Sequence, residues 1–197
     1  MGYTNQVYSI LFLCIPASQK FAGLKGMVII MQEFENIYPS DKKECYDLIH
    51  KQLKSLLEGE IYTIANLSNT CALLNSALKD INWVGFYLMH EGELLLGPFQ
   101  GKTACVHIAL GKGVCGTAAS ENKTQLVEDV HEFPGHIACD SASNSEIVVP
   151  IRVNNEVIGV LDIDSPIKNR FDEIDRGGLE EVVRLLENAC NWNIKTL

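Results

Sequence analysis

The chain has 197 residues, of which 47% are hydrophobic and 21% are charged, a balance typical of a globular protein. This composition excludes collagen-like and largely disordered chains. The length suits a single domain whose core is large enough to fold without disulfides. Only 16 residues are Lys or Arg and the formal net charge is −9. Because phosphate binding requires clustered basic residues, this balance argues against a nucleic-acid partner. The seven cysteines are an odd number, so a closed disulfide framework would leave one over.

Residues 1–31 contain two basic residues and no acidic one, so all 25 acidic residues lie in 32–197. The apolar run Val7–Ile15 is too short to span a bilayer, and it lacks the preceding basic residues of a signal peptide. We expect residues 1–31 to be an extension or a misassigned start, with a signal or membrane anchor as the alternative. Residues 32–197 are then a single domain. We place the protein in the cytosol, where thiols are reduced, with no membrane partner.

Two helices are predicted first. One begins after Asp41, a capping residue, and its apolar residues recur at helical spacing up to Gly59. The next covers Ile61 to Lys79, and we expect its buried stripe to contain Ile64, Leu67, Cys71, Leu74 and Leu78. Three cysteines on predicted helix stripes, Cys45, Cys71 and Cys190, are expected to be small buried hydrophobic residues.

After the second helix the apolar period changes to two, which predicts strands. The predicted strands are Trp83–Met89, Leu94–Leu96, Cys105–Ile108, Leu126–Val130, Ile147–Val153 and Val157–Ile163. A Gly-rich loop, Gly111–Gly116, is expected to open a short helix near Gly116–Ser120, and Asp129–Ser145 to form a long functional loop. Asn154-Asn155 predicts a hairpin turn between the last two strands, and a final helix starts near Asp172. This order of elements predicts an α+β fold with a mainly antiparallel sheet.

Three cysteines lie outside the helix stripes: Cys105, Cys115 and Cys139. Each has a His or Lys nearby in the sequence, which would lower the thiol pKa towards the reactive thiolate. The gaps of nine and 23 residues provide no local pair of zinc ligands, and a cysteine hydrolase needs only one thiol. Redox chemistry uses several thiols, because one becomes a sulfenic acid and another captures it. The residues alone leave redox chemistry only slightly ahead of three structural cysteines.

Three acidic residues form a second candidate cluster. Asp162 and Asp164 end an apolar strand and share one face of it, and Glu146 precedes the neighbouring strand. Carboxylates held together beside an apolar wall repel each other and lose hydration, so we expect at least one to keep its proton near neutral pH. Solvent-exposed strand ends, or ligands for a hard cation such as Mg²⁺, are the alternatives. Trp83 and Tyr87 share a strand face and would line a pocket or simply belong to the core.

Six motifs, in this order, resemble those of the free methionine-(R)-sulfoxide reductases, a family of GAF-domain enzymes. The motifs are Ile81–Tyr87, Gly97–Lys102 with Ala104-Cys105, Gly111–Ala118, Phe133–Asp140, Ser145–Ile151 and Gly159–Ser165. The resemblance covers roughly residues 34–190. It implies a GAF-like fold with a central antiparallel sheet and helices on both sides, in a homodimer. It also implies reduction of the free R epimer of methionine sulfoxide and a role in oxidative stress.

Residue roles follow from the same resemblance. Cys139 matches the nucleophile, Cys105 the main resolving cysteine and Cys115 a further redox-active cysteine, although these assignments differ between family members. A Cys105–Cys139 disulfide is therefore expected. The substrate-pocket residues of the family match Trp83, Tyr87, Glu146, Asp162 and Asp164. The resemblance implies no metal or other bound cofactor, with thioredoxin and its NADPH-dependent reductase recycling the disulfide.

Two other functions stay open. Asn169–Glu173 superficially resembles a motif of GAF domains that bind cyclic nucleotides, so a non-catalytic small-ligand sensor is the first alternative. The second is a structural zinc module, in which His107, His131 or His136 would join the three cysteines as the fourth ligand. We favour the simpler interpretation that Asp172 caps the last helix.

Overall fold

The computed structural model describes residues 38–135 and 141–192. Within these residues, six strands form one antiparallel sheet in the order β3-β2-β1-β6-β5-β4. The elements in chain order are α1 (Lys42–Leu57), α2 (Thr63–Ala77), β1 (Trp83–His90), β2 (Glu93–Gly101), β3 (His107–Ala109), α3 (Gly113–Glu121), β4 (Gln125–Val127), a 3₁₀ turn (Val130–Glu132), β5 (Ser145–Val153), β6 (Glu156–Ser165) and α4 (Glu173–Ala189). This is an α+β fold with one antiparallel sheet, as the sequence predicts. Of the described helices, none is long and apolar enough to cross a membrane.

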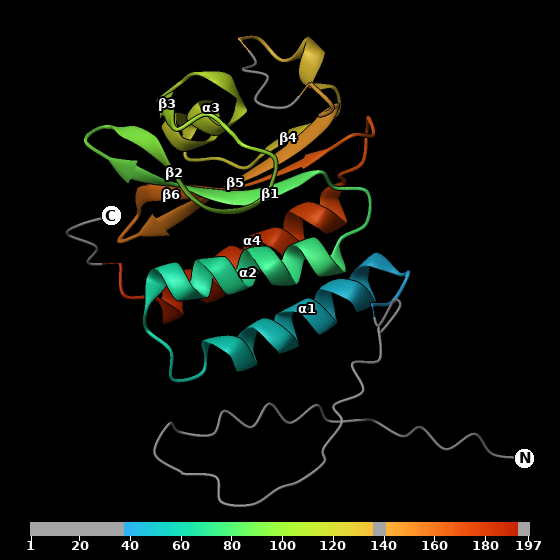
Figure 1. The fold of residues 1–197 in the computed structure, drawn as a ribbon, viewed down its shortest axis with the longest axis vertical. Coiled ribbons are helices and arrows are strands. Elements are labelled where there is room, and N and C mark those ends of the chain that lie inside the picture. Colours follow the sequence, from blue (N-terminus) through green and yellow to red (C-terminus); the bar gives the residue numbers. More distant parts are fainter. Residues whose placement is uncertain (1–37, 136–140, 193–197) are drawn as a thin grey trace, which may run out of the picture. The chain divides into compact units, whose positions relative to one another are not determined.

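Helices cover both faces of the sheet (Figure 1). On one face α2 and α4 pack against the strands, and α1 packs against those two helices. On the other face lies the short α3, with the loop that leads into it. Each face of the sheet therefore has its own apolar core, one towards the three long helices and one towards α3.

The central strand β1 is buried on both faces, since Trp83 to Leu88 are all inaccessible. The alternating side chains Val84, Phe86 and Leu88 join the core under the long helices. Trp83 and Tyr87 project to the opposite face and join the core beside α3. The strand alternation thus separates a face that serves stability from a face that carries the candidate site.

Helix capping agrees with the sequence analysis. The Asp41 side chain accepts a hydrogen bond from the Glu44 amide at 3.0 Å, and Asp172 caps α4 in a reciprocal capping box with Asp175. Asp172 therefore has the simpler role that we favoured for Asn169–Glu173. Cys45, Cys71 and Cys190 are buried, as predicted, but Ile64 is 44% exposed, so its place on the buried stripe of α2 was wrong.

Three predicted boundaries near the candidate site differ from the structure. Strand β2 continues to Gly101, because the register shift between Gly85 and Tyr87 accommodates Gly97 and Pro98 without ending the ladder. Strand β3 begins at His107, so Cys105 lies just before the strand rather than in it. Helix α3 begins at Gly113, within the predicted loop.

The last two strands form the predicted hairpin. Asn154 and Asn155 both have positive φ angles, 51° and 69°, which suits a two-residue turn between twisted strands. Residues 1–37 and 136–140 lie outside the described part of the chain. The predictions for residues 1–31 and for Cys139 therefore fall outside the described residues.

Candidate functional site

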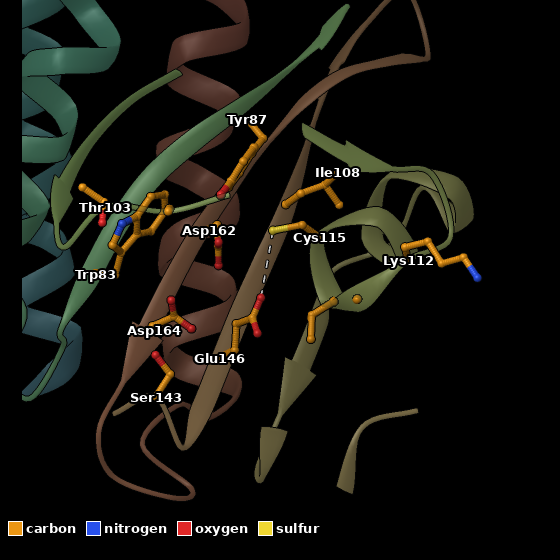
Figure 2. Close-up of a pocket in the computed structure, with 13 residues that line it drawn as sticks. Trp83, Tyr87, Thr103, Ile108, Lys112, Cys115, Ser143, Glu146, Asp162 and Asp164 are labelled. Carbon is orange, nitrogen blue, oxygen red and sulfur yellow. Dashed lines mark hydrogen bonds between the residues drawn. The ribbon is translucent and has the colours of Figure 1, made fainter. Parts of the chain in front are cut away.

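A small cavity of about 40 Å³ lies between the sheet and α3. Its lining includes six side chains that the sequence analysis singled out: Trp83, Tyr87, Cys115, Glu146, Asp162 and Asp164 (Figure 2). They come from β1, β5, β6 and α3, so the cavity exists only in the folded chain.

Strand register brings the three carboxylates together. Glu146 of β5 is paired with Asp164 of β6, and Asp162 lies two residues along β6 on the same face. Glu146 and Asp162 are each only 6% exposed. The predicted convergence of these acids is therefore present, and two of the three are removed from bulk water.

Burial sets the protonation of this cluster. Desolvation, followed by the charges of Asp162 and Asp164, raises the pKa of Glu146 well above its ordinary value. Desolvation raises the pKa of Asp162 to about 6. Burial and the repulsion between these carboxylates therefore favour the protonated form of Glu146, in line with the expectation that at least one acid of the cluster keeps its proton.

An aromatic wall faces the acids. The Trp83 ring stacks on Tyr87 with ring centroids 6.0 Å apart and on Phe99 with centroids 5.3 Å apart. The Trp83 indole N–H donates to the Lys102 carbonyl at 3.0 Å, which fixes the ring plane. The indole packs directly over Gly85, where a Cβ would lie 2.4 Å from the ring. Glycine is needed there because any side chain would displace the wall of the cavity.

Cys115 occupies the first turn of α3 and is 5% exposed. Its thiol lies 4.0 Å from Glu146 Oε1, as the dashed line in Figure 2 shows. Burial, and then the charges of Asp162 and Glu146, raises the pKa of this thiol well above its ordinary value. The expectation that nearby basic residues lower it was wrong for Cys115, because carboxylates, not cations, surround the sulfur.

Comparison with known proteins identifies the family. The GAF domain model matches residues 67–190. The free methionine-R-sulfoxide reductase of Escherichia coli (strain K12) is 54% identical over 149 residues, which cover 76% of this chain and 90% of the relative. The solved structure of fRMsr of Staphylococcus aureus in complex with substrate is 57% identical, covers 79% of this chain and 99% of that one, and has a TM-score of 0.72. Protein YtsP of Bacillus subtilis (strain 168) is 56% identical over 151 residues, covering 76% of this chain and 93% of the relative.

This chain belongs to the free methionine-(R)-sulfoxide reductase family of GAF-domain enzymes. Within this reductase fold, Cys105 lies beside the cavity, because the Tyr87 hydroxyl donates to the Cys105 carbonyl at 3.0 Å and the neighbouring Ala104 lines the cavity. Cys105 is half-buried, whereas Cys115 is buried. Cys139 lies outside the described residues.

Further residues line the reductase cavity without having been predicted: Thr103, Ile108, Lys112 and Ser143. Ser143 is buried, and its hydroxyl accepts a hydrogen bond from the Asn82 amide at 3.0 Å. Lys112 is the residue before α3 and belongs to the Gly-rich motif Gly111–Gly116. The motif marks the start of α3 beside the site. Because the helix was predicted to begin near Gly116 instead of Gly113, the position of Lys112 at the helix start was missed.

Proposed function

We propose that this enzyme reduces free methionine-(R)-sulfoxide to methionine with its own cysteine thiols. One observation carries the proposal: two buried carboxyl groups, Glu146 and Asp162, and an aromatic wall line one cavity together with Cys115. The names of the relatives support the same substrate. No metal or other cofactor takes part, and the electrons come from the thiols.

The cavity has complementary groups for each part of the substrate. Asp162 Oδ1 is buried and has no hydrogen-bond partner among the described residues, so it is available to accept from the substrate ammonium. The Trp83 and Tyr87 rings would contact the methyl group and orient the sulfur, which would select the R epimer.

The chemistry then needs a thiolate and an acid. The Cys139 thiolate attacks the sulfoxide sulfur while Glu146 protonates the oxygen, with Asp164 as the other candidate acid. The oxygen passes to the cysteine, so methionine leaves and Cys139 becomes a sulfenic acid. We do not assign the attack to Cys115, because its carboxylate surroundings disfavour the thiolate.

Recycling completes the reaction. The Cys105 thiol condenses with the Cys139 sulfenic acid, which releases water and forms a disulfide. Thioredoxin, itself reduced by an NADPH-dependent reductase, returns both cysteines to thiols, and the cytosolic location that we propose is one where thiols stay reduced. Cys105 is half-buried and the adjacent Val106 is 52% exposed, so a protein reductant can approach there. We also propose that the enzyme is a homodimer, and the molar mass measured by light scattering of the purified protein tests this.

A coupled assay tests this function. Purified enzyme, thioredoxin, thioredoxin reductase and NADPH are mixed with each epimer of free methionine sulfoxide. We expect NADPH oxidation with the R epimer, none with the S epimer, and none in Cys139→Ser. No turnover with the R epimer, or equal turnover in Cys139→Ser, would overturn the proposal. Stabilisation by cyclic nucleotides in a thermal shift experiment would instead favour the sensor.

A further inference from the structure

Three metal-ligating side chains converge in the cavity from three elements. Cys115 comes from α3, Glu146 from β5 and Asp162 from β6 (Figure 2). The Cys115 Sγ and one carboxylate oxygen of each acid all lie within 4.8 Å of one another. All three residues are buried, so packing fixes their positions.

The cluster has no positive partner within the described residues. In 38–135 and 141–192, no Lys, Arg or His forms an ion pair with Glu146 or Asp162. The Oδ1 atom of Asp162 is buried there without a hydrogen-bond partner. A buried carboxylate oxygen without a partner is costly, so this arrangement points to a cationic ligand. The sulfur and oxygen atoms that the cluster offers determine which metal cation it would prefer.

A thiolate with two carboxylates favours a borderline cation over a hard one. Mg²⁺ and Ca²⁺ take oxygen ligands, whereas Zn²⁺ binds cysteine sulfur, at about 2.3 Å, and carboxylate oxygen, at roughly 2.0–2.2 Å. Two ligands of a tetrahedral Zn²⁺ are then roughly 3.6 Å apart. Side chains that already lie within 4.8 Å of one another need only small rotations to reach this spacing. The cavity of about 40 Å³ has room for a water as the fourth ligand.

We propose that Cys115, Glu146 and Asp162 bind one Zn²⁺ ion in the reduced protein and that this ion reversibly inhibits the enzyme. Because zinc is bound by a thiolate and by carboxylates, binding releases the protons of Cys115 and Glu146 to the solvent. The metal takes the Asp162 oxygen that we assign to the substrate ammonium, so metal and substrate exclude each other. The inhibitory part rests on the proposed function, whereas the binding part does not. This ligand set also differs from the cysteine trio considered for zinc from the sequence, since Cys115 is its only thiol.

Metal binding is tested first, without turnover. Reduced, metal-free protein is titrated with Co²⁺, whose thiolate charge-transfer absorption reports a sulfur ligand, and with Zn²⁺ by calorimetry. We expect one Zn²⁺ to bind per chain. Cys115→Ala should lose both the absorption and tight Zn²⁺ binding, and Asp162→Asn should weaken Zn²⁺ affinity by about tenfold or more. Cys71→Ala is the matched control, because Cys71 is buried in the other core. Thermal unfolding verifies that each variant is folded.

Two results would overturn the site. One is unchanged Zn²⁺ binding in Cys115→Ala, and the other is loss of binding in Cys105→Ala or Cys139→Ala, which would assign the metal to the other thiols. In the coupled assay, Zn²⁺ should raise the KM for the sulfoxide and a chelator should restore it. Zn²⁺ binding at Cys115 without any change in the KM for the sulfoxide would refute the inhibition by zinc. A chain that binds Zn²⁺ at Cys115 but does not reduce the sulfoxide would refute only the proposed function.

Discussion

At the scale of single residues, Glu146 is the acid that the proposed mechanism requires. Its pKa is raised by burial and by two neighbouring carboxylates, so its acid form persists to higher pH than that of an ordinary glutamic acid. If Glu146 protonates the sulfoxide oxygen, the reductive step must slow as pH rises through this raised pKa.

Glu146→Gln removes this proton but keeps a polar side chain of similar size. We expect the rate of methionine formation in a single turnover to fall by about 10²–10⁴-fold. We also expect the alkaline decline of the wild-type pH profile to disappear in the variant. A variant that keeps the same decline would assign the proton to another group, with Asp164 as the next candidate.

Asp162 provides a prediction about stability. Its pKa is raised to about 6 in the folded protein, above the ordinary aspartate value, so the folded state holds the proton more tightly than the unfolded chain. This contribution to stability is complete below about pH 4 and is lost as pH rises through about 6. Asp162→Asn should therefore increase the free energy of unfolding at pH 7.5 by about 1–3 kcal/mol and change it little at pH 4.5.

Urea denaturation at the two pH values measures this difference. The exposed Asp47 of α1 is the matched control, and Asp47→Asn should have a small effect at both. An Asp162→Asn variant that is less stable than wild type at pH 7.5 would contradict the argument. Stabilisation with a higher KM would indicate that this carboxylate costs stability and serves binding.

At the scale of elements, the sequence was most informative where pattern and local chemistry agree. The hairpin at Asn154-Asn155 and the Asp172 cap of α4 were predictable, because both depend on neighbouring residues. The length of β2 was not, since its continuation past Pro98 depends on a shifted register with β1. The start of α3 was missed because glycines usually disfavour helices, and this placed Cys115 in a loop.

Two adjacent glycines in α4 provide a paired test of helix packing. A Cβ at Gly177 would meet nothing within 4 Å, whereas a Cβ at Gly178 would lie 2.4 Å from the Tyr46 ring. Gly177→Ala should therefore raise the free energy of unfolding by about 0.5–1 kcal/mol, since alanine favours helix. Gly178→Ala should lower it by about 1–3 kcal/mol, because the added methyl group overpacks the contact between α1 and α4. Urea denaturation of both variants measures the two changes in the free energy of unfolding. Equal changes in the two variants would contradict this packing.

At the scale of the whole molecule, the two faces of the sheet have separate tasks. The long helices bury one core, and the opposite face presents the acids, the aromatic wall and Cys115 to the cavity. The grouping of these side chains could be predicted, because strand alternation and hairpin register determine it. Their burial, and with it the raised thiol pKa of Cys115, depends on how α3 closes over the sheet, which no local pattern contains.

A single turnover tests the central claim most directly. Fully reduced protein is mixed with one equivalent of free methionine sulfoxide containing both epimers, without any external reductant, and products and cysteine pairs are identified by mass spectrometry. The account predicts that methionine forms, that only the R epimer is consumed, and that a Cys105–Cys139 disulfide appears. Consumption of the S epimer, or methionine formation that persists in Cys139→Ser, would contradict it.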